Sequence, residues 1–189
     1  MIKILNNKFK PRIKARIRKN RQTLNRNLDN FFEWVKGAEL VELEQCNIKE
    51  DPVRPELDNI FRRSYGRKIY GVKYNGKIHA VMCFAFTNTI PKNVEELDKL
   101  SHDAYLQSAQ RDQNIGNIAI AYTVWSKKKG GGKLIVNEVF KKIKRSNHLN
   151  RLVTLSPLTQ MATKFHTKNG AKLLQINENT QNFEYKIIK

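Results

Sequence analysis

Apolar residues recur at two different periods along this 189-residue chain, and each change of period marks a new element. Residues 13–35 carry apolar side chains at three- and four-residue steps, which predicts a helix that ends near Gly37. Residues 38–46 alternate well enough to predict a first strand. A short helix is then expected to begin at Pro55, because proline suits the first position of a helix.

The clearest local signal is the Asn75-Gly76 pair between two apolar runs. Asn-Gly favours the turn of a two-residue β hairpin, so we predict paired strands over about 67–74 and 77–86. The other elements expected outside the central stretch are a helix or ordered insertion over about 94–109 and closing strands over 172–177 and 182–188.

Residues 117–171 are the stretch around which we expect the fold to be organised. They predict a strand, a glycine-rich turn at 130–132, a helix, a second strand and a second helix. Glycines let the backbone approach a ligand, and the first N–H groups of a helix favour an anion such as phosphate. A flexible basic loop would have the same composition. The alternation of strands and helices predicts a mixed α/β sheet with helices on both faces.

Two short motifs in this stretch carry a family resemblance. Lys127-Lys128-Lys129-Gly130-Gly131-Gly132 fits Q/R-x-x-G-x-G/A, with Lys127 in the Gln/Arg place. The later helix keeps the spacing A-x-x-[LF]-Y-x-x-x-G-F through Ala162, Phe165, His166, Gly170 and Ala171. His166 replaces the usual tyrosine and Ala171 the usual aromatic residue. In this order, the motifs resemble the GNAT superfamily of acyl-CoA-dependent N-acetyltransferases.

The resemblance implies the acyl-CoA N-acyltransferase fold over residues 37–189, with residues 1–36 as a separate basic arm. It implies that the strands at 117–125 and 152–157 splay apart and hold acetyl-CoA, or another acyl-CoA, between them. A backbone N–H near Val124 would then polarise the thioester carbonyl. The positions it assigns to this cosubstrate are Val124, Trp125, Lys127, Lys128, Lys129, Gly130, Gly131, Gly132 and Lys133.

Three residues are candidates for catalysis. His166 stands in the place of the family's general acid, and an imidazole can do acid work near neutral pH. Tyr122 and Ser156 are hydroxyls on the two splayed strands, although Tyr122 could equally belong to the core. His166 could also serve only in binding or packing. The candidates for a general base rest on residue type alone: His79, His102, Asp103 and Asp112.

The charge of the chain is strongly positive, with 36 Lys and Arg against 17 Asp and Glu and a formal net charge of +19. Such an excess favours polyanions, either nucleic acid or phosphorylated cofactors. The N-terminal segment reads as a solvated arm, a nucleic-acid contact or an anionic-membrane contact. The residues proposed for a nucleic-acid contact are Arg12, Lys14, Arg16, Arg18, Lys19 and Arg21.

The composition and the cysteine content limit the kinds of protein that this chain could be. A hydrophobic content of 40% indicates a globular protein, and neither a membrane-spanning run nor a secretory signal is expected. Cys46 and Cys83 lie in apolar candidate strands and read as buried free thiols in a reducing cytoplasm, outside any metal-like cluster.

Three functions are therefore considered. The first is acyl transfer from CoA to an amine, possibly on a nucleic acid or an associated protein. The second is nucleic-acid binding by an inactive scaffold. The third is another CoA-thioester reaction such as decarboxylation, because Thr154-Leu155-Ser156-Pro157 is similar to a stretch of malonyl-CoA decarboxylases. The oligomeric state and the acceptor are not indicated.

Overall fold

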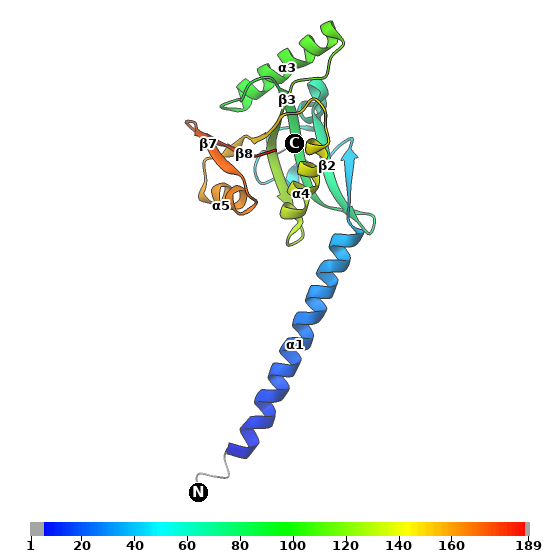
Figure 1. Cartoon of the computed structure of the whole chain (residues 1–189), viewed down its shortest axis with the longest axis vertical. Helices are drawn as coiled ribbons and strands as arrows, with labels where there is room; N and C mark the ends of the chain where they lie inside the picture. Colours follow the sequence, from blue (N-terminus) through cyan, green and yellow to red (C-terminus); the bar gives the residue numbers. More distant parts are fainter. Residues whose placement is uncertain (1–5, 188–189) are drawn as a thin grey trace. The chain divides into compact units, whose positions relative to one another are not determined.

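The computed structural model describes residues 6–187, with the side chains at 6–18, 25 and 27 left outside the description. The chain divides into two compact units, with the boundary between residues 38 and 39. The helix expected over residues 13–35 lies within α1 (Asn6–Gly37), which begins earlier and ends at the expected glycine. Figure 1 shows α1 as one continuous helix.

The second unit is built on a mixed sheet in the order β1-β2-β3-β4-β5-β8-β6, with β7 paired to β8. β4 and β5 are parallel, and the other pairs are antiparallel. The strands are β1 (Glu39–Leu43), β2 (Lys68–Tyr74), β3 (Lys77–Thr87), β4 (Ile118–Ser126), β5 (Arg151–Thr154), β6 (Ser156–Pro157), β7 (Lys172–Ile176) and β8 (Thr180–Tyr185). The helices of this unit are α2 (Asn59–Arg63), α3 (Val94–Arg111), α4 (Gly131–Lys144) and α5 (Gln160–Lys168), with single 3-10 turns at Ile48–Glu50 and Ser64–Gly66.

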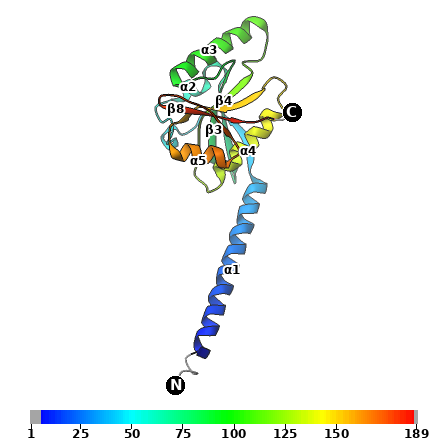
Figure 2. The ribbon, with the colours of Figure 1, turned by 60° about the vertical axis from the view of Figure 1, so that its left-hand side comes forward.

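Helices cover both faces of the sheet, as the alternation of elements predicted. Val81 and Cys83 share one core cluster with Leu97 of α3. Ala80 and Met82 point the other way, because side chains alternate along a strand. α4 packs against β2, β3 and β4 on that second face, where its first residue, Gly131, lies against Ala80. The two views in Figures 1 and 2 show α3 and α4 on different sides of the strands.

The predicted hairpin is confirmed. Asn75 and Gly76 connect β2 to β3 with φ angles of 49° and 73°, the left-handed region that a two-residue turn of this kind requires. The turn fixes the register of β3, the strand that pairs with β4 and so supports the central part of the sheet.

Three predicted boundaries are wrong. Cys46 lies in the loop after β1 rather than in the strand. α2 begins at Asn59 rather than Pro55, because the Asp58 carboxylate accepts a hydrogen bond from Phe61 N at 2.7 Å and caps the helix there. β8 begins at Thr180, two residues earlier than expected, since its first residues pair with both β6 and β7.

The two central strands separate as predicted. β4 and β5 pair from Ile118 to Ala121, and Leu155 N still donates to Ala121 O at 2.9 Å. Beyond this point β4 continues beside β3, whereas β6 pairs with β8. The expected strand over 152–157 is therefore broken at Leu155. A register shift opposite Tyr122 adds a β-bulge to β4 at the same level, and bulges bend the strand that carries them.

Candidate active site

A cavity of about 330 Å³ opens where β4 and β6 diverge. α4 and α5 contribute further walls, so the cavity lies between the glycine turn and the Leu-Ser-Pro stretch. Its walls are mainly apolar, so groups that point inward have few polar neighbours. The apolar residues that line it are Pro52, Val53, Met82, Ala121, Val124, Trp125, Val136, Leu152, Pro157, Met161, Ala162 and Phe165. Among the described residues, its charged lining consists of Glu50 and Lys127.

Three polar side chains in the cavity wall form one hydrogen-bonded chain. The His166 imidazole lies between two hydroxyl groups: its Nε2 is 2.8 Å from Ser156 Oγ and its Nδ1 is 3.0 Å from Tyr185 Oη. Ser156 Oγ also donates to Thr154 Oγ1 at 3.0 Å. Acid–base and nucleophilic sites share this arrangement, in which a hydroxyl is hydrogen-bonded to one imidazole nitrogen and a second group orients the ring through the other nitrogen.

The His166 ring is held firmly and kept neutral. It is 5% exposed and stacks on Phe183 with the ring centroids 5.1 Å apart. Burial lowers the pKa of His166 from 6.5 to about 4, because a charged imidazolium would lose its hydration. Near neutral pH the ring therefore carries one proton, so one nitrogen donates and the other accepts. Such a ring can relay a proton between the Ser156 and Tyr185 hydroxyls.

The buried imidazole should make the protein sensitive to mild acid. In the unfolded chain His166 binds a proton as the pH falls below about 6.5, whereas the folded chain resists until about 4. Between these two pH values the unfolded state binds more protons than the folded state. The free energy of unfolding should therefore decrease as the pH falls, by on the order of 3 kcal/mol in all. Urea unfolding at pH 7 and at pH 4 measures how much free energy of unfolding each protein loses on acidification. The loss should be larger by this amount in the wild type than in His166→Gln. Equal losses would contradict the burial of an uncharged ring.

The glycine turn brings the start of α4 to the other end of the cavity. Gly130 caps the helix with φ 84°, a left-handed conformation that favours glycine. A Cβ on Gly131 would lie 3.0 Å from Ser126 Cβ, so a side chain there would displace the helix from the sheet. Gly132 lines the cavity, where a Cβ would lie 3.0 Å from the Phe165 ring. The first N–H groups of a helix lack intrahelical acceptors and suit an anion.

The lysines of the turn are placed differently from one another. Lys127 Nζ lies 2.6 Å from Glu50 Oε2, and Lys128 Nζ lies 4.8 Å from the centre of the Tyr74 ring. Lys129 and Lys133 are exposed at the start of α4. The last two lysines are therefore better placed than Lys127 to supply charge to an anion at the helix end.

Tyr122 lies apart from the hydrogen-bonded chain. Its ring belongs to the core cluster on the α3 face and meets the Phe61 ring edge-on, with the centroids 5.9 Å apart. Tyr122 nevertheless lines the cavity, as do Val124 and Trp125, which are expected to lie beside a thioester. The base candidates fall elsewhere: His102, Asp103 and Asp112 lie at or beyond α3, and His79 lines a second cavity.

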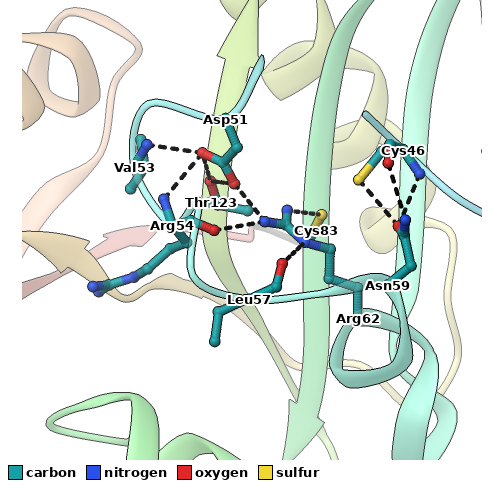
Figure 3. A network of polar contacts seen from close by, with 9 residues as sticks. All are labelled: Cys46, Asp51, Val53, Arg54, Leu57, Asn59, Arg62, Cys83 and Thr123. Carbon is teal, nitrogen blue, oxygen red and sulfur yellow. Dashed lines mark hydrogen bonds and ion pairs between the residues drawn. The ribbon is translucent and has the colours of Figure 1, made fainter. Parts of the chain in front are cut away.

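Tyr185 was missed by the sequence analysis, as was a buried polar network that begins in the loop before α2. Asp51 accepts from Arg62 Nη2 at 2.8 Å and from Thr123 Oγ1 at 2.8 Å, and all three residues are at most 3% exposed (Figure 3). The network ties the loop to β4 beside Val124. Tyr185 and the buried Phe183 are two positions apart on a predicted strand, so their side chains lie on the same face. That spacing indicates a face turned toward the core, but it does not indicate a functional role.

The basic segment is only partly described. Lys19 and Arg21 are exposed on α1, whereas the side chains of Arg12, Lys14, Arg16 and Arg18 lie outside the described ones. The nucleic-acid contact therefore stays a prediction. Over residues 6–187, no helix combines the length and apolarity needed to cross a bilayer, and no cluster of His, Cys, Asp and Glu is suited to a metal ion.

No protein-family model and no curated protein matches the sequence, but solved structures match the fold. The GNAT-like decarboxylase GphF, in complex with isobutyryl-CoA, matches with a TM-score of 0.59 and 10% identity, over 79% of this chain and 100% of that chain. An acetyltransferase of Bacillus subtilis in complex with CoA matches with a TM-score of 0.53 and 12% identity, over 80% and 99% of the two chains.

A malonyl-CoA decarboxylase of Cupriavidus metallidurans also matches, with 20% identity and a TM-score of 0.47 over 77% of this chain. This chain spans 38% of the length of that protein. The likenesses with TM-scores above 0.5 show the architecture: the second unit has the acyl-CoA N-acyltransferase (GNAT) fold, as its motifs predicted.

Proposed function

We propose that this chain is an acyl-CoA-dependent enzyme that holds the thioester in the cavity between β4 and β6. The observation that carries the proposal is the Ser156–His166–Tyr185 chain, which lines an apolar cavity whose other end is a glycine-rich helix start. Two solved structures with this fold contain CoA or isobutyryl-CoA, which supports the choice of ligand. The pyrophosphate would bind at the start of α4, near Lys129 and Lys133.

The reaction that the site supports best is decarboxylation of a carboxyacyl thioester. The bond between the α-carbon and the carboxylate breaks, and its electron pair moves onto the thioester as an enolate while CO2 leaves. A proton then adds to the α-carbon. Apolar walls favour this step, because a carboxylate loses hydration there while its charge becomes delocalised. The likeness to a GNAT-like decarboxylase supports the same reaction.

The residues of the cavity divide these tasks. The N–H of Val124, at the splayed end of β4, would donate to the enolate oxygen, where charge develops. Ser156 would deliver the proton to the α-carbon, and His166 would replace it through the 2.8 Å contact. Tyr185 orients the imidazole from its other nitrogen. The proton comes ultimately from water, so the reaction balances as carboxyacyl-CoA plus a proton giving acyl-CoA and CO2.

Transfer of the acyl group to an amine is the second candidate, and the GNAT-like motifs favour it. Its difficulty is the base. An ordinary amine arrives as an ammonium ion with a pKa near 10, whereas His166 has a pKa of about 4 and accepts a proton poorly. Glu50, the carboxylate in the lining, is paired with Lys127. Acyl transfer would therefore require an amine that reaches the cavity uncharged.

Ligand binding is the first expectation to test. Acetyl-CoA should raise the Tm with concentration, to a plateau that ADP does not reach, because a ligand that binds only the folded state stabilises it. Lys133→Glu should weaken acetyl-CoA about tenfold, roughly 1.4 kcal/mol, by placing a negative charge beside the phosphates. Lys144→Glu, the same change at the far end of α4, is the matched control. A similar loss in both variants would indicate only the general basic charge.

The reaction is tested by comparing two substrates under one set of conditions. Malonyl-CoA should give CO2 and acetyl-CoA with no release of free CoA thiol. Acetyl-CoA with a panel of primary amines should release little thiol above the background. Thiol release that depends on an amine would instead select acyl transfer, and the absence of both products with saturating acyl-CoA bound would contradict the enzyme proposal.

A further inference from the structure

The two cysteines, which the proposed reaction does not use, come together at the end of the buried network. Cys83 lies in β3 and is fully buried, whereas Cys46 is half-buried in the loop after β1. Cys46 packs against the core cluster that contains Cys83, and its Sγ donates to Asn59 Oδ1 at 3.5 Å. Figure 3 shows the two side chains in one region, with dashed lines from the Cys83 sulfur to Arg62 and from the Cys46 sulfur to Asn59. Two thiols 37 positions apart in sequence thus share one site.

A buried cation lies beside this pair. Arg62 Nη1 lies 3.3 Å from Cys83 Sγ, and the guanidinium is 0% exposed. The neighbouring Cys83 thiol, helped by the charge of Arg62 and opposed by burial and by Asp51, lowers the pKa of Cys46 to about 7. Burial raises the pKa of Cys83 well above its usual value, so Cys83 stays protonated and can donate to the Cys46 thiolate.

The Cys46 thiol is also reachable. It lines a second cavity of about 230 Å³, together with His79, Trp125 and Lys127. The loop that carries it is fixed by Asn59: Cys46 N donates to Asn59 Oδ1 at 3.0 Å, and Asn59 Nδ2 donates back to Cys46 O at 3.1 Å. The sulfur is therefore held at the cavity wall, where it also donates to Asn59 Oδ1 at 3.5 Å.

We propose that Cys46 and Cys83 form a redox-reactive thiol pair, in which Cys46 reacts with a peroxide that enters the second cavity and Cys83 resolves the product. An accessible, activated thiol beside a second cysteine is the arrangement that redox-sensing sites require. This proposal does not depend on the reaction of the first cavity.

The chemistry has two steps and needs hydrogen peroxide as the oxidant. The Cys46 sulfur attacks one peroxide oxygen, the O–O bond breaks, and a sulfenic acid and water are formed. The Cys83 sulfur then attacks the Cys46 sulfur, the S–O bond breaks, and a disulfide and a second water are formed. Overall, two thiols are oxidised by two electrons, and the peroxide is reduced. A dithiol such as dithiothreitol reverses the change.

The test is oxidation of the full chain with hydrogen peroxide, followed by denaturation, alkylation and mass spectrometry. The wild type should lose both free thiols and gain a Cys46–Cys83 cross-linked peptide that dithiothreitol removes. In Cys83→Ala, Cys46 should stop at the sulfenic acid and be trapped by dimedone. In Cys46→Ala, Cys83 should remain alkylatable, because it is buried.

Three results would overturn the proposal: two free thiols in the wild type after peroxide, a disulfide that joins two chains through Cys46 alone, or equal oxidation of Cys83 in Cys46→Ala. Circular dichroism before oxidation establishes that each variant is folded. If Cys83→Ala does not fold, the wild-type product still decides, because an intrachain cross-link requires both sulfurs.

Discussion

Ser156→Ala should lower kcat for malonyl-CoA by about 10²- to 10⁴-fold while acetyl-CoA binding changes little, because in the proposed reaction the hydroxyl protonates the α-carbon. His166→Gln should lower kcat by a similar factor, since it interrupts the proton path between Ser156 and Tyr185. Groups that act as one unit lose their effect together, so the double variant should be scarcely slower than either single one. CO2 release under saturating substrate measures all three.

A matched control separates chemistry from folding. Ser108→Ala removes another buried hydroxyl, one that donates to Tyr105 O within α3 and lies outside the cavity lining. Its kcat should stay within about twofold of the wild type. If Ser156→Ala turns over at the wild-type rate with an unchanged Tm, the hydrogen-bonded chain does not carry the reaction, whatever binds in the cavity.

Arg62→Met should destabilise the fold by about 3–5 kcal/mol, because it leaves the Asp51 carboxylate buried without its cation. Both side chains of the pair are 0% exposed, and the ion pair is 2.8 Å long. Arg62 also donates to Leu57 O and Arg54 O (Figure 3). The substitution therefore leaves three oxygen acceptors of the loop before α2 without their donor. The midpoint of urea unfolding measures the loss.

The adjacent arginine provides the control. Arg63 makes an ion pair of 2.6 Å with Glu44, but these side chains are 31% and 85% exposed. Surface pairs of this kind contribute less than about 1 kcal/mol, so Arg63→Met should shift the midpoint only slightly. If the two variants lose comparable stability, burial does not determine how much the Arg62–Asp51 ion pair contributes to the free energy of unfolding.

The sequence predicted those parts of the site that local patterns encode. The Asn75-Gly76 turn, the glycine turn at 130–132 and the paired motifs each specify their own conformation within a few residues, and the splayed strands follow from their order. Ser156 and His166 were found because both belong to one motif-rich stretch.

The missed residues act through contacts between distant parts of the chain. Tyr185 meets His166 across 19 positions, and Thr123 meets Asp51 across 72. No period or motif relates such partners, since tertiary packing alone brings them together. Cys46 was assigned to a strand for a related reason: the alternation of polar and apolar residues continues past Leu43, although the backbone turns away to meet Asn59.

The position of β8 sets the order in which the site can be completed during synthesis. This strand pairs with β5, β6 and β7, and it supplies Tyr185 to the imidazole. A nascent chain emerges from the ribosome from its N-terminus, so the hairpin and the glycine turn are available long before residues 180–185. Until those residues dock, the outer edges of β5 and β6 lack their partner, and the cavity has no third member of its hydrogen-bonded chain. Assembly of the proposed catalytic groups therefore has to wait until β8 docks.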